Sequence, residues 1–281
     1  MSSKVFILRF DIDSHHDMHN GVPHTLDLLS SFQVPAVFFV NMGRLINRRE
    51  ILFGSPKRSF RNAVPKDRSK VGMLQKMGFR QMADLLLRNP EVGRRNVALL
   101  ERAVSLGHEL GLHGGDNHTT WLRHGGKYAT EEIDRLAASS FDAFTRSFGP
   151  PQGFTSPGFQ FTPAVEAWLV DRHFLYQMDL YGSDERPDLL RRPFSLPVTI
   201  IGEHTVPFIE WSDVQGIAED EQVRAFKSRL TRDYVCMYGH PGYEGLARSA
   251  LLGKYIRCVL DAGFDCQTPL SCIRALQKAE P

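Results

Sequence analysis

The stretch that decides the fold reads VFILRFDID and runs from Val5 to Asp13. Its opening residues are continuously apolar, which is typical of a strand buried on both faces of a parallel sheet. Polar residues follow at the carboxyl end, where β/α barrel enzymes place their active sites. Asp11 and Asp13 lie two apart in extended chain, so both carboxylates are expected on one face of the strand. Aspartates at a strand end more often form turns or cap helices, so the pair alone does not decide between the two interpretations.

The rest of the chain alternates apolar runs with helical spacing. A helix begins at Val22-Pro23, because proline is tolerated in the first turn of a helix. Six to eight strand and helix units in one chain imply parallel pairing and a closed or nearly closed β/α barrel, so we expect a single α/β domain over 1–281. The other predicted strands are 36–40, 109–113, 153–156, 174–179, 196–201 and 234–238, and the other helices are 97–106, 129–148, 163–172, 220–232, 247–262 and 269–278.

Basic residues are concentrated in one segment. The chain carries a net charge of +2 with 42% hydrophobic and 23% charged residues, as is usual for a globular protein with a full core. Between Arg44 and Arg80, eleven basic residues stand against two acidic ones, which gives +9 there and leaves −7 elsewhere. We interpret the overlapping region 53–95 as an inserted lid or docking surface, with a solvated basic face as the alternative. Its amphipathic part contains Met73, Leu74, Met77, Phe79, Met82 and Leu85.

The apolar segments are too short for a signal peptide or a membrane span, so we expect a cytoplasmic protein. If the basic segment docks on anionic lipid, the protein would be peripheral on the inner leaflet of the cell membrane. The four cysteines lack C-x-x-C spacing, which indicates reduced core thiols; they are Cys236, Cys258, Cys266 and Cys272.

Histidines follow two more predicted strands. GHELGLHGGDNH, from Gly107 to His118, places His113 and His118 where a strand passes into a glycine-rich loop, and His240 follows strand 234–238. One carboxylate with two imidazoles can hold a metal such as Zn²⁺ and leave a position open for water. A single such histidine is more often structural, as we expect for His108. Three strand ends that carry Asp or His nevertheless converge on one predicted rim.

Together these motifs resemble the polysaccharide deacetylase superfamily, the NodB-like carbohydrate esterases of family 4. Within it, the sequence most closely resembles the deformylases of undecaprenyl-phosphate-linked 4-deoxy-4-formamido-arabinose. The motifs that carry the resemblance are RFDID at 9–13, GVP at 21–23, NMGR at 41–44, GHELGLH at 107–113, LPVT at 196–199, and His240 with Glu244-Gly245.

The resemblance implies a distorted (β/α) barrel and a role for each polar residue at its rim. The metal implied is Zn²⁺, with Co²⁺, Mn²⁺ or Ni²⁺ as alternatives. The implied roles are catalytic base for Asp11, metal ligands for Asp13, His113 and His118, proton donor to the leaving amine for His240, and orientation of that donor for Asp179.

The implied reaction is hydrolysis of an N-acyl amide, formyl or acetyl, on an amino sugar that is lipid-linked or a surface-polysaccharide precursor. The metal would lower the pKa of a bound water to about 7. A backbone N–H of the loop at Gly158 and Phe159 would hold the oxyanion. Arg44 and the other arginines of the basic segment 44–80 could hold a substrate phosphate in paired hydrogen bonds.

Two positions depart from the family pattern. The usual spacing is His-x-x-x-His, whereas here Asn117 takes the last place and His118 follows it, so Asp116 or Asn117 is an alternative third ligand. The arginine that steers the catalytic base is absent from the stretch 154–160, and Arg9 or an arginine of the insert could take its place.

Two other functions are open. A deacetylase of a soluble or nucleotide-linked amino sugar would differ only in the acyl group and in the absence of a lipid. A non-catalytic relative would bind anionic lipid or nucleic acid through the basic segment. Asp11 and His240 argue against that relative, since metal binding alone needs neither, and we expect no nucleic-acid partner.

Overall fold

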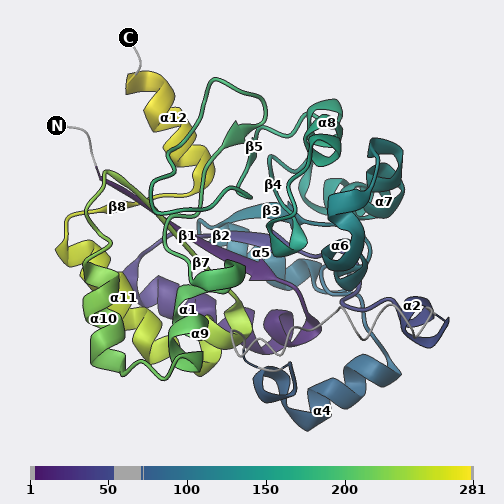
Figure 1. The fold of residues 1–281 in the computed structure, drawn as a ribbon, viewed down its shortest axis with the longest axis horizontal. Helices are drawn as coiled ribbons and strands as arrows, with labels where there is room; N and C mark the ends of the chain where they lie inside the picture. Colours follow the sequence, from purple (N-terminus) through teal and green to yellow (C-terminus); the bar gives the residue numbers. More distant parts are fainter. Residues whose placement is uncertain (1–3, 54–70, 72, 280–281) are drawn as a thin grey trace.

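The computed structural model contains one curled parallel sheet with helices packed around it (Figure 1). It describes residues 4–53, 71 and 73–279. The strands are β1 (Val5–Ile12), β2 (Val37–Val40), β3 (Glu109–His113), β4 (Gly153–Thr155), β5 (Tyr176–Gln177), β6 (Phe194–Ser195), β7 (Tyr234–Gly239) and β8 (Asp265–Cys266). Their hydrogen-bonded order is β6-β5-β4-β3-β2-β1-β7, with β8 on the first residues of β1. The prediction of a distorted (β/α) barrel is confirmed.

The sheet curls round through a stretch that is not a regular strand. Residues 196–201 were predicted as a strand, but β6 ends at Ser195 and only single bridges follow. These bridges join Val198 to Tyr181 and Ile200 to Met237 of β7. Pro197 lies between Ser195 and the first bridge and has no N–H to donate, which prevents a continuous ladder there.

Helices cover the outside of the sheet. They are α1 (Val22–Phe32), α2 (Arg48–Phe53), α4 (Met73–Leu87), α5 (Val97–Ser105), α6 (His118–His124), α7 (Thr130–Phe148), α8 (Pro163–Asp171), α9 (Phe208–Val214), α10 (Glu219–Lys227), α11 (Ser249–Asp261) and α12 (Pro269–Ala279). The predicted helices match these within two residues, except that α10 ends well before Arg232. After Ser228, the N–H groups of Arg229 and Leu230 donate to carbonyls three residues back instead of four, so the α-helix has ended.

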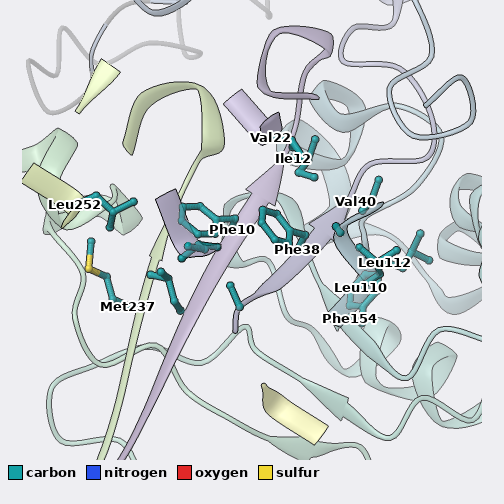
Figure 2. Packing of buried hydrophobic residues seen from close by; sticks show 14 of the residues in the cluster. Phe10, Ile12, Val22, Phe38, Val40, Leu110, Leu112, Phe154, Met237 and Leu252 are labelled. Carbon is teal, nitrogen blue, oxygen red and sulfur yellow. The ribbon is translucent and has the colours of Figure 1, made fainter. Parts of the chain in front are cut away.

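Side chains of β1 divide between two apolar clusters. The outer cluster, under the helices, receives Phe6, Leu8, Phe10 and Ile12. Phe10 stacks on Phe38 of β2 with ring centroids 5.4 Å apart, and Figure 2 shows the two rings beside each other in this layer. The inner cluster, inside the barrel, receives Val5 and Ile7. Because side chains alternate along a strand, Arg9 and Asp11 continue the inner row towards the carboxyl end.

Most of the described part of the insert is helical. Helix α4 is kinked at Gly78, where φ is +77°, and it lies at the edge of the molecule near α2 (Figure 1). Leu85 and Met82 pack against Leu45 and Ile46. Much of the predicted basic and amphipathic character belongs to parts of the insert that lie outside the described residues. These parts are residues 54–70 and 72 and the side chains of Met73, Leu74 and Met77.

In the ranges that the structure describes, no helix is both long and apolar enough to cross a membrane. The four cysteines are free, and Cys236, Cys258 and Cys272 are buried, in agreement with the prediction of reduced core thiols.

Candidate active site

Asp13, His113 and His118 meet at the carboxyl ends of β1 and β3. Nε2 of His113 lies 3.0 Å from Oδ1 of Asp13, and Nε2 of His118 lies 3.2 Å from Oδ2. One ligand atom from each residue lies within 4.8 Å of the others. Ligands about 2.1 Å from a tetrahedral Zn²⁺ are roughly 3.4 Å from one another, so this spacing suits a single ion.

Thr155 of β4 orients the first of these imidazoles. Its Oγ1 lies 2.7 Å from Nδ1 of His113, which leaves Nε2 directed at Asp13. A hydrogen bond to the second ring nitrogen is the usual way in which proteins fix a metal-binding histidine. Thr155 therefore belongs to the site, although the sequence did not single it out.

His118 is the first residue of α6, a helix that was not predicted. Its N–H donates to the carbonyl of Arg44 at 3.0 Å, and the N–H of Arg44 donates to the carbonyl of Asp116 at 2.9 Å. Gly114 makes the preceding turn at φ +60°, a conformation that other residues rarely adopt. The segment after β2 therefore fixes the loop that carries His118.

Asp116, the alternative third ligand, faces away from this group. Its Oδ1 accepts hydrogen bonds from Oγ of Ser140 at 2.6 Å and from the guanidinium of Arg94 at 3.1 Å. Asn117 pairs through its backbone with Arg44. The geometry therefore brings His118, rather than Asp116, to Asp13 and His113.

The charge balance of the cluster favours a cation. Burial alone would raise the pKa of Asp13, but the charge of His118 and hydrogen bonds from His113, His118 and His240 lower it well below its usual range. Burial would lower the pKa of His113, but Asp11 and Asp13 outweigh it and raise that pKa. A divalent ion would supply the positive charge that these carboxylates favour, so the donor set fits a metal.

Asp11 forms a paired contact with Arg9 on the inner face of β1. Nε of Arg9 donates to Oδ1 of Asp11 at 2.8 Å, and a terminal nitrogen donates to Oδ2 at 2.5 Å. The other terminal nitrogen donates to the carbonyl of Met178. Arg9 is fully buried and Asp11 is buried, yet Asp11 lines the same cavity as the three clustered residues.

His240 follows β7 and faces the cluster. Its Nε2 lies 3.5 Å from Oδ2 of Asp13. Its backbone N–H donates to Oε2 of the buried Glu244 at 2.8 Å, which fixes the turn after the strand. His240 therefore shares the cavity with Asp11 and the three clustered residues.

Asp179 is buried and is not among the residues that line the cavity. Both of its carboxylate oxygens accept the N–H of Ser156, at 2.8 and 3.0 Å. Burial raises its pKa to about 6, although the charge of Arg9 acts in the opposite direction. These contacts attach Asp179 to the loop after β4, and orientation of His240 by Asp179 stays a prediction.

The remaining predicted residues divide into two groups. Gly158 and Phe159 line the cavity, as the oxyanion prediction requires. Arg44 is not among the lining residues, since its guanidinium donates to the carbonyl of Asn89 and lies 3.7 Å from Glu91. The structure therefore does not bring the Arg44 side chain to the place where a substrate would bind.

The cavity measures about 330 Å³ and includes residues that the sequence analysis missed. Asp17 joins the loops after β1 and β7, because its Oδ2 accepts the N–H of Ser14 at 3.0 Å and its Oδ1 that of Gly242 at 3.2 Å. Glu210 of α9 is buried, and its Oε1 accepts the N–H of Val71 at 3.0 Å. An aspartate shortly after the strand that carries Asp11 was a usable signal for Asp17, whereas nothing in the sequence marked Glu210.

No protein-family model matches the chain. In a stretch of 118 residues it is 31% identical to a curated Shewanella sediminis protein named as the 4-deoxy-4-formamido-L-arabinose-phosphoundecaprenol deformylase ArnD. This match covers 40% of the present chain and only 35% of that relative.

The solved structures that resemble the chain cover it almost completely. A Mycobacterium smegmatis protein designated a polysaccharide deacetylase has a TM-score of 0.62 at 15% identity, over 100% of this chain and 93% of that one. The chain has the polysaccharide deacetylase fold. The peptidoglycan deacetylase PdaC of Bacillus subtilis gives 0.57 at 14% identity, over 99% and 94% of the two chains. The chitin deacetylase of Colletotrichum lindemuthianum gives 0.54 at 13% identity, over 97% and 88%.

These structures have the fold that the resemblance to the polysaccharide deacetylase superfamily implied, and the partial sequence match is to a protein named as a deformylase, the branch expected from the sequence motifs.

Proposed function

We propose that this protein is a metal-dependent hydrolase that removes a formyl or acetyl group from the nitrogen of an amino sugar. One observation carries the proposal: Asp13, His113 and His118 form a cluster suited to one ion, and Asp11 and His240 share its cavity. Metal binding alone would need neither of the last two residues. A purely lipid- or nucleic-acid-binding relative is therefore the weaker interpretation.

Asp13, His113 and His118 would hold the metal, with Zn²⁺ first and Co²⁺, Mn²⁺ or Ni²⁺ as alternatives. When bound, such an ion lowers the pKa of water and polarises the amide carbonyl. Asp11 would accept the proton of the attacking water, and His240 would protonate the departing amine. A backbone N–H of the loop at Gly158 and Phe159 would donate to the developing oxyanion.

We further propose a polyprenyl-phosphate-linked sugar as the substrate. The supporting observations are the partial match to a protein named as a deformylase of such a lipid, and the surface of α4. Phe79, Leu86 and Leu87 of this helix are 81%, 58% and 77% exposed. They recur at helical spacing beside Arg80 and Arg88, as in helices that lie in the interface of an anionic membrane. Peripheral contact with the cytoplasmic leaflet would bring the cavity to a lipid-carried sugar.

Mass spectrometry of metal-loaded protein incubated with N-formyl and N-acetyl amino sugars tests the proposal. Each acyl form should be offered both on a polyprenyl phosphate and on a nucleotide, with Asp11→Asn protein as the matched control. A free amine from the lipid-linked form supports the full proposal. Cleavage of the nucleotide-linked form alone favours a soluble substrate, and no amine from any form would refute the proposed activity.

A further inference from the structure

Arg9 is a fully buried charge inside the barrel that the proposed reaction does not use. The centre of its guanidinium lies 5.4 Å from the ring of Phe39, 4.7 Å from that of Phe159 and 5.2 Å from that of Tyr238. Three aromatic rings therefore surround the cation. Contacts of this kind stabilise a desolvated cation and restrict its movement.

The hydrogen bonds of Arg9 go to the strand end that carries Asp11 and to the residue before Asp179. Nε and one terminal nitrogen grip both oxygens of Asp11, and the other terminal nitrogen donates to the carbonyl of Met178. A bidentate contact fixes the position of a carboxylate and also its rotation about the Cβ–Cγ bond. Lysine could not do this, because an ammonium group has no planar pair of donors.

The rings around Arg9 come from other parts of the site. Phe159 belongs to the loop expected to hold the oxyanion, and Tyr238 lies in register beside Arg9, two residues before His240. Arg9 therefore fixes the position of Asp11 relative to the loop after β4 and to β7, the strand that His240 follows.

We infer that Arg9 is the positioning residue for Asp11, and that it replaces the arginine absent from the stretch 154–160. The inference rests on the proposed function, since it assumes that Asp11 takes a proton from water. It also explains how this chain can dispense with a polar residue of the family pattern. The guanidinium comes from two residues upstream on the same strand.

Arg9→Lys keeps the positive charge and removes the two-point contact. We expect metal content unchanged, KM within about threefold, and kcat lower by roughly 10- to 100-fold, the size of effect expected from misplacing a catalytic group by about 1 Å. Arg172→Lys is the matched control. Arg172 also pairs with an aspartate, Asp134, and lies over the ring of Phe141, but these contacts are on the outer helices. Its turnover should stay at the wild-type value.

A double-variant cycle separates positioning from general structural support. If Arg9 acts through Asp11, Arg9→Lys should lower kcat by less than about threefold in an Asp11→Asn background, since the group to be positioned is already disabled. Multiplication of the two single losses would overturn the inference, as would loss of metal from Arg9→Lys protein. Should Arg9→Lys fail to fold, Phe39→Leu is the alternative, because it removes one of the three rings around Arg9 and leaves the Arg9–Asp11 ion pair in place. Its loss of kcat should likewise be smaller in the Asp11→Asn background.

An inactive wild-type protein would refute the proposed function and this inference together. An active wild type whose Arg9→Lys variant keeps full kcat would refute the inference alone.

Discussion

Oδ2 of Asp13 lies 3.2 Å from Nε2 of His118. This contact joins the first strand to the first residue of α6, while the neighbouring Asp116 is held by Arg94 and Ser140. His118 is therefore the residue placed to complete the proposed metal site, despite its unusual spacing from His113.

Asp13→Ala, His113→Ala and His118→Ala should each abolish stoichiometric metal binding, because two protein ligands compete poorly with water for a divalent ion. Asp116→Asn is the control and should keep the metal, since its carboxylate faces away. Metal analysis of the purified proteins decides the matter. Full zinc occupancy in the three alanine variants would disprove the ligand assignment.

Asp11→Asn should retain the metal and lose turnover by roughly two to four orders of magnitude, the usual contribution of a positioned general base. His240→Ala should behave similarly, because it removes the proposed proton donor to the amine. Steady-state rates on an N-acyl amino sugar with a poor leaving amine provide the test. A near-wild-type rate in either variant would remove that residue from the proposed mechanism.

Protonation of His108 should lower the stability of the fold in acid. Its Nδ1 accepts the N–H of Ala36 at 3.1 Å, and burial lowers its pKa to about 4. The unfolded chain takes up this proton near pH 6.5, so the free energy of unfolding should fall as the pH drops from about 6.5 through about 4.

Protonation of His108 should lower the free energy of unfolding by roughly 2 to 3 kcal/mol as the pH falls from about 7.5 to about 4.5. His108→Gln cannot titrate and should lack this part of the pH dependence. Denaturant unfolding of both proteins at the two pH values measures the difference. Identical pH dependence in the two proteins would show that His108 does not contribute.

Helix α4 should bind anionic vesicles at low salt. Each basic residue near such a surface contributes about 1 kcal/mol, and added salt screens the attraction. Phe79→Ser and Arg80→Glu should weaken co-sedimentation, whereas Leu190→Ser should not, because Leu190 lines a different cavity beside Val5 at the start of β1. Equal binding to neutral vesicles, or none to anionic ones, would make a soluble sugar the better substrate.

The alternation of β1 made Asp11 and Asp13 predictable, because period-two spacing and a strand end follow from local sequence alone. His113 and His240 were predictable for the same reason. The contacts of the Arg44 and Asp116 side chains were not predictable. They depend on Asn89, Arg94 and Ser140, which approach these side chains only through tertiary packing.

The sequence left two candidates for the arginine that binds Asp11, namely Arg9 or an arginine of the insert. The choice of Arg9 depends on its observed contact with both oxygens of Asp11. Helix α6 escaped prediction because its short sequence, HTTWLRH, has little helical periodicity and is fixed by backbone contacts with the segment after β2. Glu210 escaped for a comparable reason, since its place in the cavity depends on how α9 packs against the barrel.

The metal dependence of the proposed hydrolase can be measured by titrating metal into metal-free protein and following the release of formate or acetate from an N-acyl amino sugar. We expect no release without metal, and a rate that rises with bound Zn²⁺ and saturates at about one ion per chain, as for a single three-ligand site. Release that is undiminished in the metal-free protein, or equal in His113→Ala protein, would contradict this metal dependence.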